Sequence, residues 1–194
     1  MEFQVNTSCY KKTIYNSVIM KVLIISYSLT GNNQAIANNI AKEFAAEHIK
    51  ISEPKLRTTG TIFFDILFNR TPQVTPMVDR VEVYDLVIFV GPVWMGHVAT
   101  PFRAYFKHLQ TKLGKYAFVS ISGGADGENP KLANELNQRI GKKPAALIDL
   151  HIANLLPPDP KPKRKDTQAY HLNGTDVKNL TNIIVKALRE IMAK

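Results

Sequence analysis

Four short runs along the chain are apolar at both odd and even positions. They are VLIISY at 22–27, LVIFVG at 86–91, AFVSIS at 117–122 and AALIDLHI at 145–152. A strand that is covered on both faces has this pattern, whereas a strand with one face in water alternates apolar and polar residues. A weaker run, IKIS at 49–52, supplies a fifth strand. The pattern therefore predicts a sheet of five buried strands.

Apolar residues at helical spacing lie between these runs and after the last one. They are Ile36, Ile40 and Phe44, then Phe102, Phe106 and Leu109, then Leu132, Leu136 and Ile140, and finally Leu180, Ile184, Ala187, Leu188 and Ile191. Strands that alternate with helices form parallel sheets, because right-handed crossovers place the helices on the two faces. We therefore expect a three-layer α/β/α sandwich around a five-stranded parallel sheet. Asn129 and Thr175 are predicted to cap the helices that follow them.

Three segments depart from this alternation. Residues 61–68, TIFFDILF, are interpreted as a short helix that packs on the domain, or as part of a partner surface, and packing is favoured. Residues 154–174 are predicted to form a long loop, to which we assign no chemical role. Residues 1–19 lack the apolar core and the cleavage site of a signal peptide, so we interpret them as an N-terminal extension. The folded domain is expected to span residues 20–194.

Composition narrows the class of protein. A chain of 194 residues with 45% apolar residues is long enough for one well-buried core and short for two. It has no apolar stretch of the roughly 18–20 residues that a membrane span needs. A single cysteine, Cys9, excludes an internal disulfide and a cysteine metal cluster. We therefore expect a soluble cytoplasmic protein of one domain, with no membrane partner and no metal site.

The chain is basic, with a formal net charge of +9. Such a charge favours anionic partners. Its main local concentration is KPKRK at 161–165, inside the predicted long loop, where a solvated segment is the favoured interpretation. No zinc spacing or recognition-helix pattern accompanies this run, so nucleic-acid binding is not expected.

The loop after the first strand, SLTGNN at 28–33, has the composition of an anion site. Gly31 lets the chain turn tightly into a helix, whose first N–H groups lack partners within the helix and attract an anion. Hydroxyls of Ser28 and Thr30 and amides of Asn32 and Asn33 would complete the shell. The lysine of a Walker loop and the three glycines of a dinucleotide fingerprint are missing. These residues suit one phosphate held by neutral donors, although the same residue types also cap helices for structural reasons.

Two further loops follow strands at the same expected edge of the sheet. In GPVWMGHVATP, 91–101, the single tryptophan, Trp94, lies at a loop tip, where a planar ligand would cover it, unless it folds back onto the domain. In SGGADGENP, 122–130, the glycines allow a ligand to approach the backbone closely, unless the loop is a simple flexible turn. Because ligands bind outside the carboxyl ends of parallel strands, the three loops together predict a phosphate at one end and a flat ring at the other.

With these motifs the chain resembles the flavodoxin-like family of FMN-binding proteins, from about Met20 to the C-terminus. The residues that carry the resemblance are KVLIISYSLTGNN, YDLVIFVGPVWMGHVATP and KYAFVSISGG. The resemblance implies the strand order 2-1-3-4-5 and non-covalently bound FMN. It implies a phosphate site made of Ser28, the backbone N–H of Leu29, Thr30, Gly31, Asn32 and Asn33. It also implies a ring site made of Pro92, Val93, Trp94, Met95, Gly96, Ser122, Gly123 and Gly124.

Two titratable residues of the ring loops are candidates for a role at the flavin. His97 is a candidate donor to the flavin, with an ordinary solvent-facing histidine as the favoured alternative. Asp126 is a candidate contact to the ring or to a substrate, with turn stabilisation as an equal alternative. The chain departs from electron-carrier flavodoxins in its basic charge and in GGADGENP, where carriers often have a tyrosine. One flavin face is therefore expected to be more open than in a typical carrier.

Flavin supplies the redox chemistry itself, so we expect no catalytic side chain. The first functional hypothesis is a flavodoxin-like protein that exchanges electrons with redox partner proteins. The alternative is an FMN-dependent NAD(P)H oxidoreductase that acts on quinones or similar acceptors. A flavin-free binding module is the third hypothesis. A monomer or a homodimer is compatible with each of them.

Overall fold

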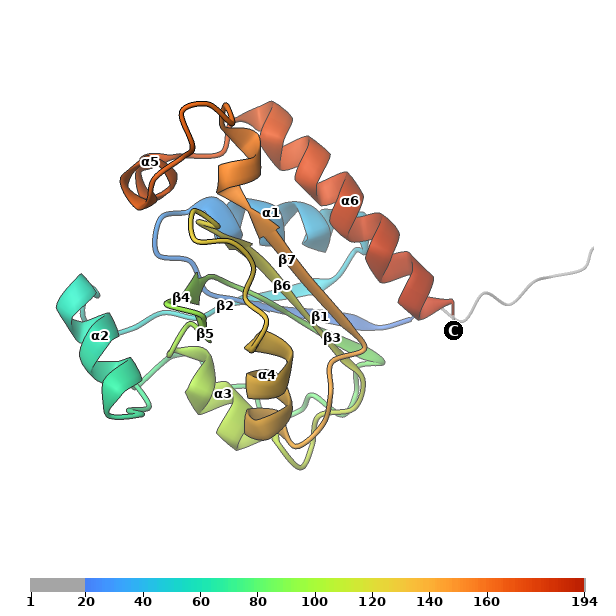
Figure 1. Cartoon of the computed structure of the whole chain (residues 1–194). Coiled ribbons are helices and arrows are strands. Elements are labelled where there is room, and N and C mark those ends of the chain that lie inside the picture. The colour runs from blue at the N-terminus through green and yellow to red at the C-terminus, as the bar shows by residue number, and fades with distance from the viewer. Residues whose placement is uncertain (1–19, 194) are drawn as a thin grey trace, which may run out of the picture.

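The computed structural model describes residues 20–193, and its central sheet lies between two layers of helices (Figure 1). The strands of the sheet are β1 (Val22–Ser26), β2 (Glu47–Lys50), β3 (Leu86–Val90), β6 (Tyr116–Ser122) and β7 (Ala146–His151). All are parallel, in the order β2-β1-β3-β6-β7. Counted without the short hairpin between β3 and β6, this is the predicted order 2-1-3-4-5. The predicted extension, residues 1–19, lies outside the described residues.

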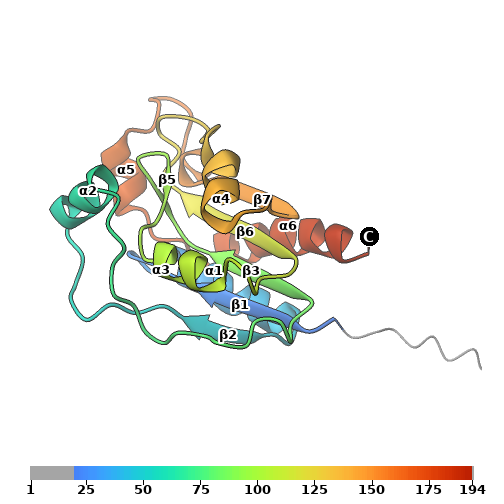
Figure 2. The same cartoon turned by 90° about the horizontal axis from the view of Figure 1, so that it is seen from below.

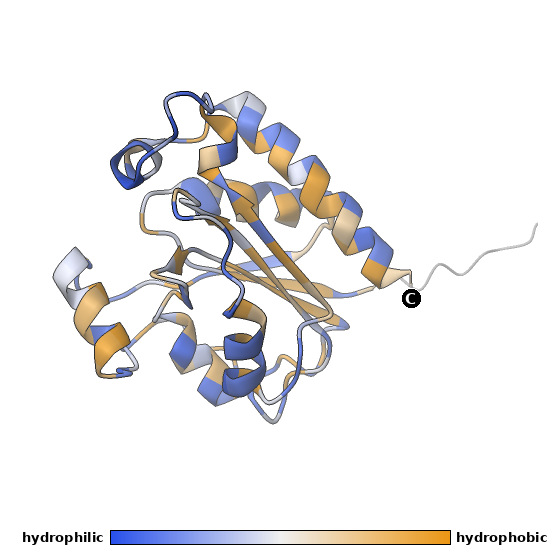
Figure 3. Cartoon of the chain, viewed as in Figure 1, coloured by the Kyte–Doolittle hydropathy of each residue, from blue (hydrophilic) through white to orange (hydrophobic). Residues whose placement is uncertain are grey.

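Two separate cores form because successive strand residues point to opposite faces of the sheet. Helices α1 (Asn32–Glu43) and α6 (Gly174–Met192) cover one face, and α3 (Phe102–Leu109) and α4 (Leu132–Ile140) cover the other (Figures 1 and 2). Leu23 and Ile25 of β1 pack with the aromatic residues of α3, and Ile24 packs with α1 and α6. Figure 3 shows apolar strands at the centre and helices that carry both hydrophobic and hydrophilic residues. This α/β/α architecture is the predicted one.

The remaining elements are short. They are the hairpin of β4 (Val93–Trp94) and β5 (His97–Val98), the helix α2 (Thr59–Leu67), the 3₁₀ turn η1 (Ile152–Leu155) and the helix α5 (Arg164–Ala169). Residues 154–174, predicted as a loop, therefore contain a helix. Within residues 20–193, every helix is too short or too polar to span a membrane.

The packing predicted for residues 61–68 is wrong in one respect. A helix does form there, and a capping box between Thr58 and Thr61 starts it. However, Ile62 is its only buried residue, while Phe63, Phe64 and Leu67 are about half exposed. The aromatic residues of this helix are therefore partly exposed to solvent.

Both predicted helix caps are wrong. Helix α4 begins at Leu132, with Lys131 in the cap position and no side-chain cap, while the amide of Asn129 donates to Asp149 Oδ2 at 2.7 Å. Helix α6 begins one residue before Thr175, and Asn173 caps it by accepting from the N–H groups of Thr175 and Asp176.

Candidate functional site

Three loops meet at the carboxyl edge of the sheet, as the sequence predicts. Residues 27–31 follow β1, residues 91–101 follow β3 and residues 123–131 follow β6, and in Figure 1 all three lie on the left of the molecule. Helix α2 lies on one side of this edge and α5 on the other (Figure 1). Of the three, the loop after β1 is the simplest to interpret.

The β1–α1 loop fits a phosphate. Gly31, at the N-cap of α1, has a left-handed φ of 92°, and the position of an added Cβ is open space. No side chain caps the helix, so its first N–H groups face this open region. Ser28 Oγ accepts from the Gly31 N–H at 3.0 Å, which fixes the turn, and the Thr30 side chain is exposed. A phosphate monoester on these donors would replace the missing cap.

The two asparagine amides do not complete this shell. Asn32 Nδ2 donates to the Tyr170 carbonyl at 2.8 Å, and Asn32 Oδ1 accepts from the Leu172 N–H at 3.0 Å. Asn33 makes the same kind of bridge to both backbone groups of Ile121, each at 2.9 Å. Both side chains are buried. The expectation that these amides hold the phosphate is therefore corrected, and only their backbone N–H groups are left for an anion.

The second loop is a two-residue hairpin. Trp94 pairs with His97 across it, and both turn residues, Met95 and Gly96, have positive φ, at 51° and 79°. This is the turn that matches the twist of two short strands, and it holds Met95 in a conformation that costs a non-glycine residue about 1 kcal/mol or more. The Met95 side chain is 58% exposed at the tip. Another apolar side chain, Leu29, is exposed on the neighbouring loop.

Trp94 packs partly onto the domain. Its ring meets Tyr27 edge-on at 5.7 Å, and the Arg57 guanidinium lies 5.6 Å from the ring centre. Trp94 is half-buried. This lies between the two interpretations that the sequence left open, a ring free to be covered by a planar ligand and a ring folded back onto the domain. The side not covered by Tyr27 and Arg57 is what a planar ligand would use.

Arg57 belongs to a buried polar cluster beneath the hairpin. Its guanidinium binds Glu53 through two nitrogens and Asp65 at 2.6 Å, and Tyr27 donates to Glu53 at 2.9 Å. Burial disfavours the charge on Arg57, but the hydrogen bonds to Glu53 and Asp65 outweigh it and raise the pKa of the guanidinium. Burial and the bond to Glu53 raise the pKa of Tyr27, which stays a neutral donor. Arg57 therefore stays protonated, and its contact with the Trp94 ring fixes that side chain.

The glycines at the start of the third loop lie where neighbouring side chains leave no room for a Cβ atom. A Cβ on Gly124 would lie 2.3 Å from the Cβ of His151, and one on Gly123 would lie 2.9 Å from Thr167 Oγ1. The Gly123 carbonyl also accepts from the Ala153 N–H at 3.0 Å. Close packing against Thr167 and His151 thus explains both glycines.

Asp149, in the second half of β7, accepts hydrogen bonds from three donors in or near the third loop. They are Ser122 Oγ at 3.2 Å, Asn129 Nδ2 at 2.7 Å and His151 Nε2 at 3.2 Å. The Ser122 side chain, predicted to approach the ring, is therefore buried on Asp149, and its backbone alone borders the site. Asp149 joins both ends of the third loop to the sheet.

The two titratable candidates of the ring loops are held by other residues. His97 is exposed, and its Nδ1 lies 3.4 Å from Glu135 of α4. Asp126 pairs with Arg164 of α5 at 2.7 Å. These contacts match the alternatives set out for both residues, a surface histidine and a stabilised loop, while leaving their part in ligand binding as a prediction.

Sequence reasoning missed four residues at this edge: Arg57, Tyr27, His151 and Thr167. Tyr27 follows the last residue of the first strand, so its position was a usable signal. His151 lies in the last predicted strand, whereas Arg57 and Thr167 come from segments without a hydrophobic period, and all three meet the loops only through the fold. No motif in the sequence indicates them.

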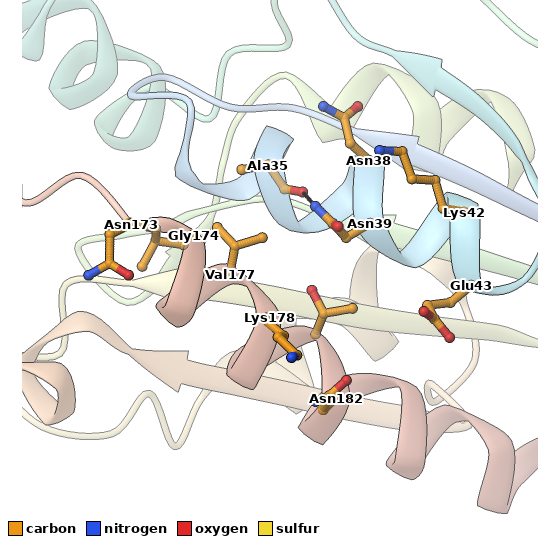
Figure 4. Close-up of a pocket in the computed structure, with 12 residues that line it drawn as sticks. Ala35, Asn38, Asn39, Lys42, Glu43, Asn173, Gly174, Val177, Lys178 and Asn182 are labelled. Atoms are coloured by element: carbon orange, nitrogen blue, oxygen red, sulfur yellow. Dashed lines mark hydrogen bonds between the residues drawn. The ribbon is translucent and has the colours of Figure 1, made fainter.

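A hollow elsewhere on the surface is separate from the candidate site. This hollow, of about 550 Å³, lies between α1 and α6 (Figure 4). Asn39, Lys42, Val177, Lys178 and Asn182 line it, and the Asn39 amide is occupied by the Ala35 carbonyl. It does not touch the ring loops, and its residues form no reactive constellation.

The strand order, the uncapped α1 loop and the two ring loops define a flavodoxin-like α/β flavoprotein, the predicted family and fold. The sequence family described as NADPH-dependent FMN reductase matches residues 20–132. This chain belongs to that family, which confirms FMN as its cofactor. The matched segment contains all three loops.

Solved structures agree on the fold. A flavoprotein of Lactobacillus acidophilus NCFM in complex with FMN is 23% identical with a TM-score of 0.59, over 67% of this chain and 93% of that one. A protein of Bacteroides uniformis ATCC 8492 described as a flavoprotein is 14% identical with a TM-score of 0.58, over 77% and 96%. Comparison with curated proteins gave no match.

Proposed function

We propose that this chain is an NADPH-dependent flavin oxidoreductase, which holds FMN at the carboxyl edge of its sheet and reduces quinones or similar acceptors, free flavin included. The observation that carries the proposal is the family match over residues 20–132, which includes every loop of the candidate site. It favours the oxidoreductase alternative over the electron carrier that the sequence analysis placed first. The predicted cytoplasmic location remains part of this proposal.

Each part of the site has a role in the proposal. The N–H groups at the start of α1, with Ser28 and Thr30, would bind the phosphate of FMN. The hairpin with Trp94 and the backbone of residues 122–124 would flank the ring, and exposed Met95 and Leu29 would shield it from water. When bound, FMN supplies the chemistry by accepting a hydride from NADPH and passing two electrons to the acceptor.

The decisive experiment is turnover without a reductase. Protein loaded with FMN is mixed with NADPH and a quinone or free FMN, and the loss of NADPH absorbance is followed. We expect rapid oxidation that depends on both the flavin and the acceptor. Turnover that appears only after a separate reductase is added would restore the electron-carrier hypothesis.

The phosphate site has its own test. Thr30→Glu places a negative charge where the phosphate should bind, so the Kd for FMN should rise by a factor of about 100 or more, while the Kd for riboflavin, which lacks the phosphate, should change little. Thr111→Glu, also exposed and far from the edge, is the control. Equal weakening of both flavins would mean that the loop does not hold the phosphate.

A further inference from the structure

Residues 161–165, KPKRK, lie beside the cofactor loops. They lead into the short helix α5, which borders the carboxyl edge in Figure 1. We define these five residues as the basic segment. It lies outside residues 20–132, the part of the chain that matches the family.

Contacts from the first and third cofactor loops hold the basic segment, and the residues that directly follow it, at this edge. Thr167, three residues after Arg164, packs against Gly123 of the third loop. Asn32, the first residue of α1, binds the backbone of Tyr170 and Leu172. Arg164 itself pairs with Asp126 of the third loop. The position of the basic segment is therefore built into the site.

Three cations of the basic segment are exposed and available. Lys161, Lys163 and Lys165 are exposed, and none makes an ion pair within residues 20–193. The phosphate loop contains no lysine or arginine, and the buried Arg57 is already neutralised by Glu53 and Asp65. In the proposed function the edge would hold one phosphate with neutral donors, and the free positive charge lies at and just before the start of α5.

We propose that the basic segment binds the adenosine phosphates of NADPH, with Lys161, Lys163 and Lys165 as the specificity-determining residues for the phosphate monoester on the ribose. Lysine is an effective binder of phosphate as a point charge. NADH lacks that monoester, so these lysines would distinguish the two dinucleotides. The inference rests on the proposed function, since it names the site of that function's electron donor.

A matched pair of variants tests the inference in the FMN-loaded full chain. One variant replaces Lys161, Lys163 and Lys165 with glutamine. The control replaces Lys107, Lys143 and Lys186, exposed lysines on other parts of the surface, with the same change in net charge. We expect the first variant to raise the KM for NADPH about tenfold, with kcat and the KM for NADH little changed and the Kd for FMN unaltered. The control should keep wild-type values.

Calorimetry with 2′,5′-adenosine bisphosphate separates this inference from the proposed function. The wild-type protein should bind it at least about tenfold more tightly than adenosine 5′-monophosphate, and the first variant should lose that difference. If the wild type does not oxidise NADPH, the proposed function fails, and this titration still tests the segment. If the first variant keeps the wild-type KM and the same preference, or loses only binding to heparin or RNA, the inference is overturned.

Discussion

Asn33 shows how one side chain can support a site without binding its ligand. Strand β3 ends at Val90, so the N–H and C=O of Ile121, which point to the same side as Val119, have no strand beside them. The Asn33 amide takes the place of that strand by donating to one group and accepting from the other. It thereby fixes the start of α1 to the end of β6. The first and third loops keep their spacing through this side chain.

Replacing Asn33 with alanine should be costly, because it leaves the N–H and C=O of Ile121 buried and unpaired. We expect the free energy of unfolding to fall by about 2–4 kcal/mol in urea titrations. Asn38→Ala, in the same helix, should cost no more than about 0.5 kcal/mol, since Asn38 binds only Gln34. Equal losses would show that the Asn33 bridge contributes nothing.

Among the elements, α2 is held by polar anchors more than by apolar packing. Asp65 of this helix binds Arg57, and the buried Arg103 of α3 donates to the carbonyls of Asp65 and Arg70. With only Ile62 buried, the helix has little hydrophobic contact with the domain. The orientation of the helix therefore depends on the two arginines, one of which, Arg57, also lies over the Trp94 ring.

Arg57→Leu should remove this anchor and leave Glu53 and Asp65 without a cation. We expect a loss of about 3–5 kcal/mol in the free energy of unfolding, because the three side chains are at most 15% exposed. The fluorescence of Trp94 should change as the helix loosens. Arg164→Leu is the matched control, because its ion pair with Asp126 is exposed to solvent and should contribute little to stability. Similar stability of the two variants would contradict the anchoring role.

For the whole molecule, the apolar runs and helical periods were sufficient to predict the layers, the five strands and the edge that carries the site. Each of these features follows from local patterns of apolar residues that recur along the chain. The anchoring of α2 and the packing of α5 could not be predicted, because Arg57 meets Trp94 and Thr167 meets Gly123 across long separations without any period. The roles of Asn32 and Asn33 were mistaken for the same reason. Their partners lie about 90 to 140 residues away.

The stability of the whole molecule should fall in mild acid through His48. This histidine joins β2 to β1 by its contact with the buried Ser26 Oγ at 2.8 Å. Burial, and then the charge of Lys50, lower its pKa below the ordinary value of 6.5. The unfolded chain therefore takes up a proton before the folded one, so the free energy of unfolding is greatest above the ordinary pKa and decreases as the pH falls below it.

Urea unfolding of the wild type between about pH 7 and pH 5 should show this decrease, and His48→Gln should show a smaller one. His171→Gln, which changes an exposed histidine, should follow the wild type. An unchanged pH dependence in the His48 variant would rule out this histidine as the source.

The bridge from Asn32 to Tyr170 and Leu172 has a consequence for how the protein is made. The phosphate loop is among the first parts of the domain to leave the ribosome, yet its first helical residue has its partners 138 and 140 residues further on. Domains fold as units during synthesis. The cofactor loop is therefore synthesised early but can take its final structure only after residue 172 has been made. A nascent chain that ends before residue 172 would bind its flavin poorly.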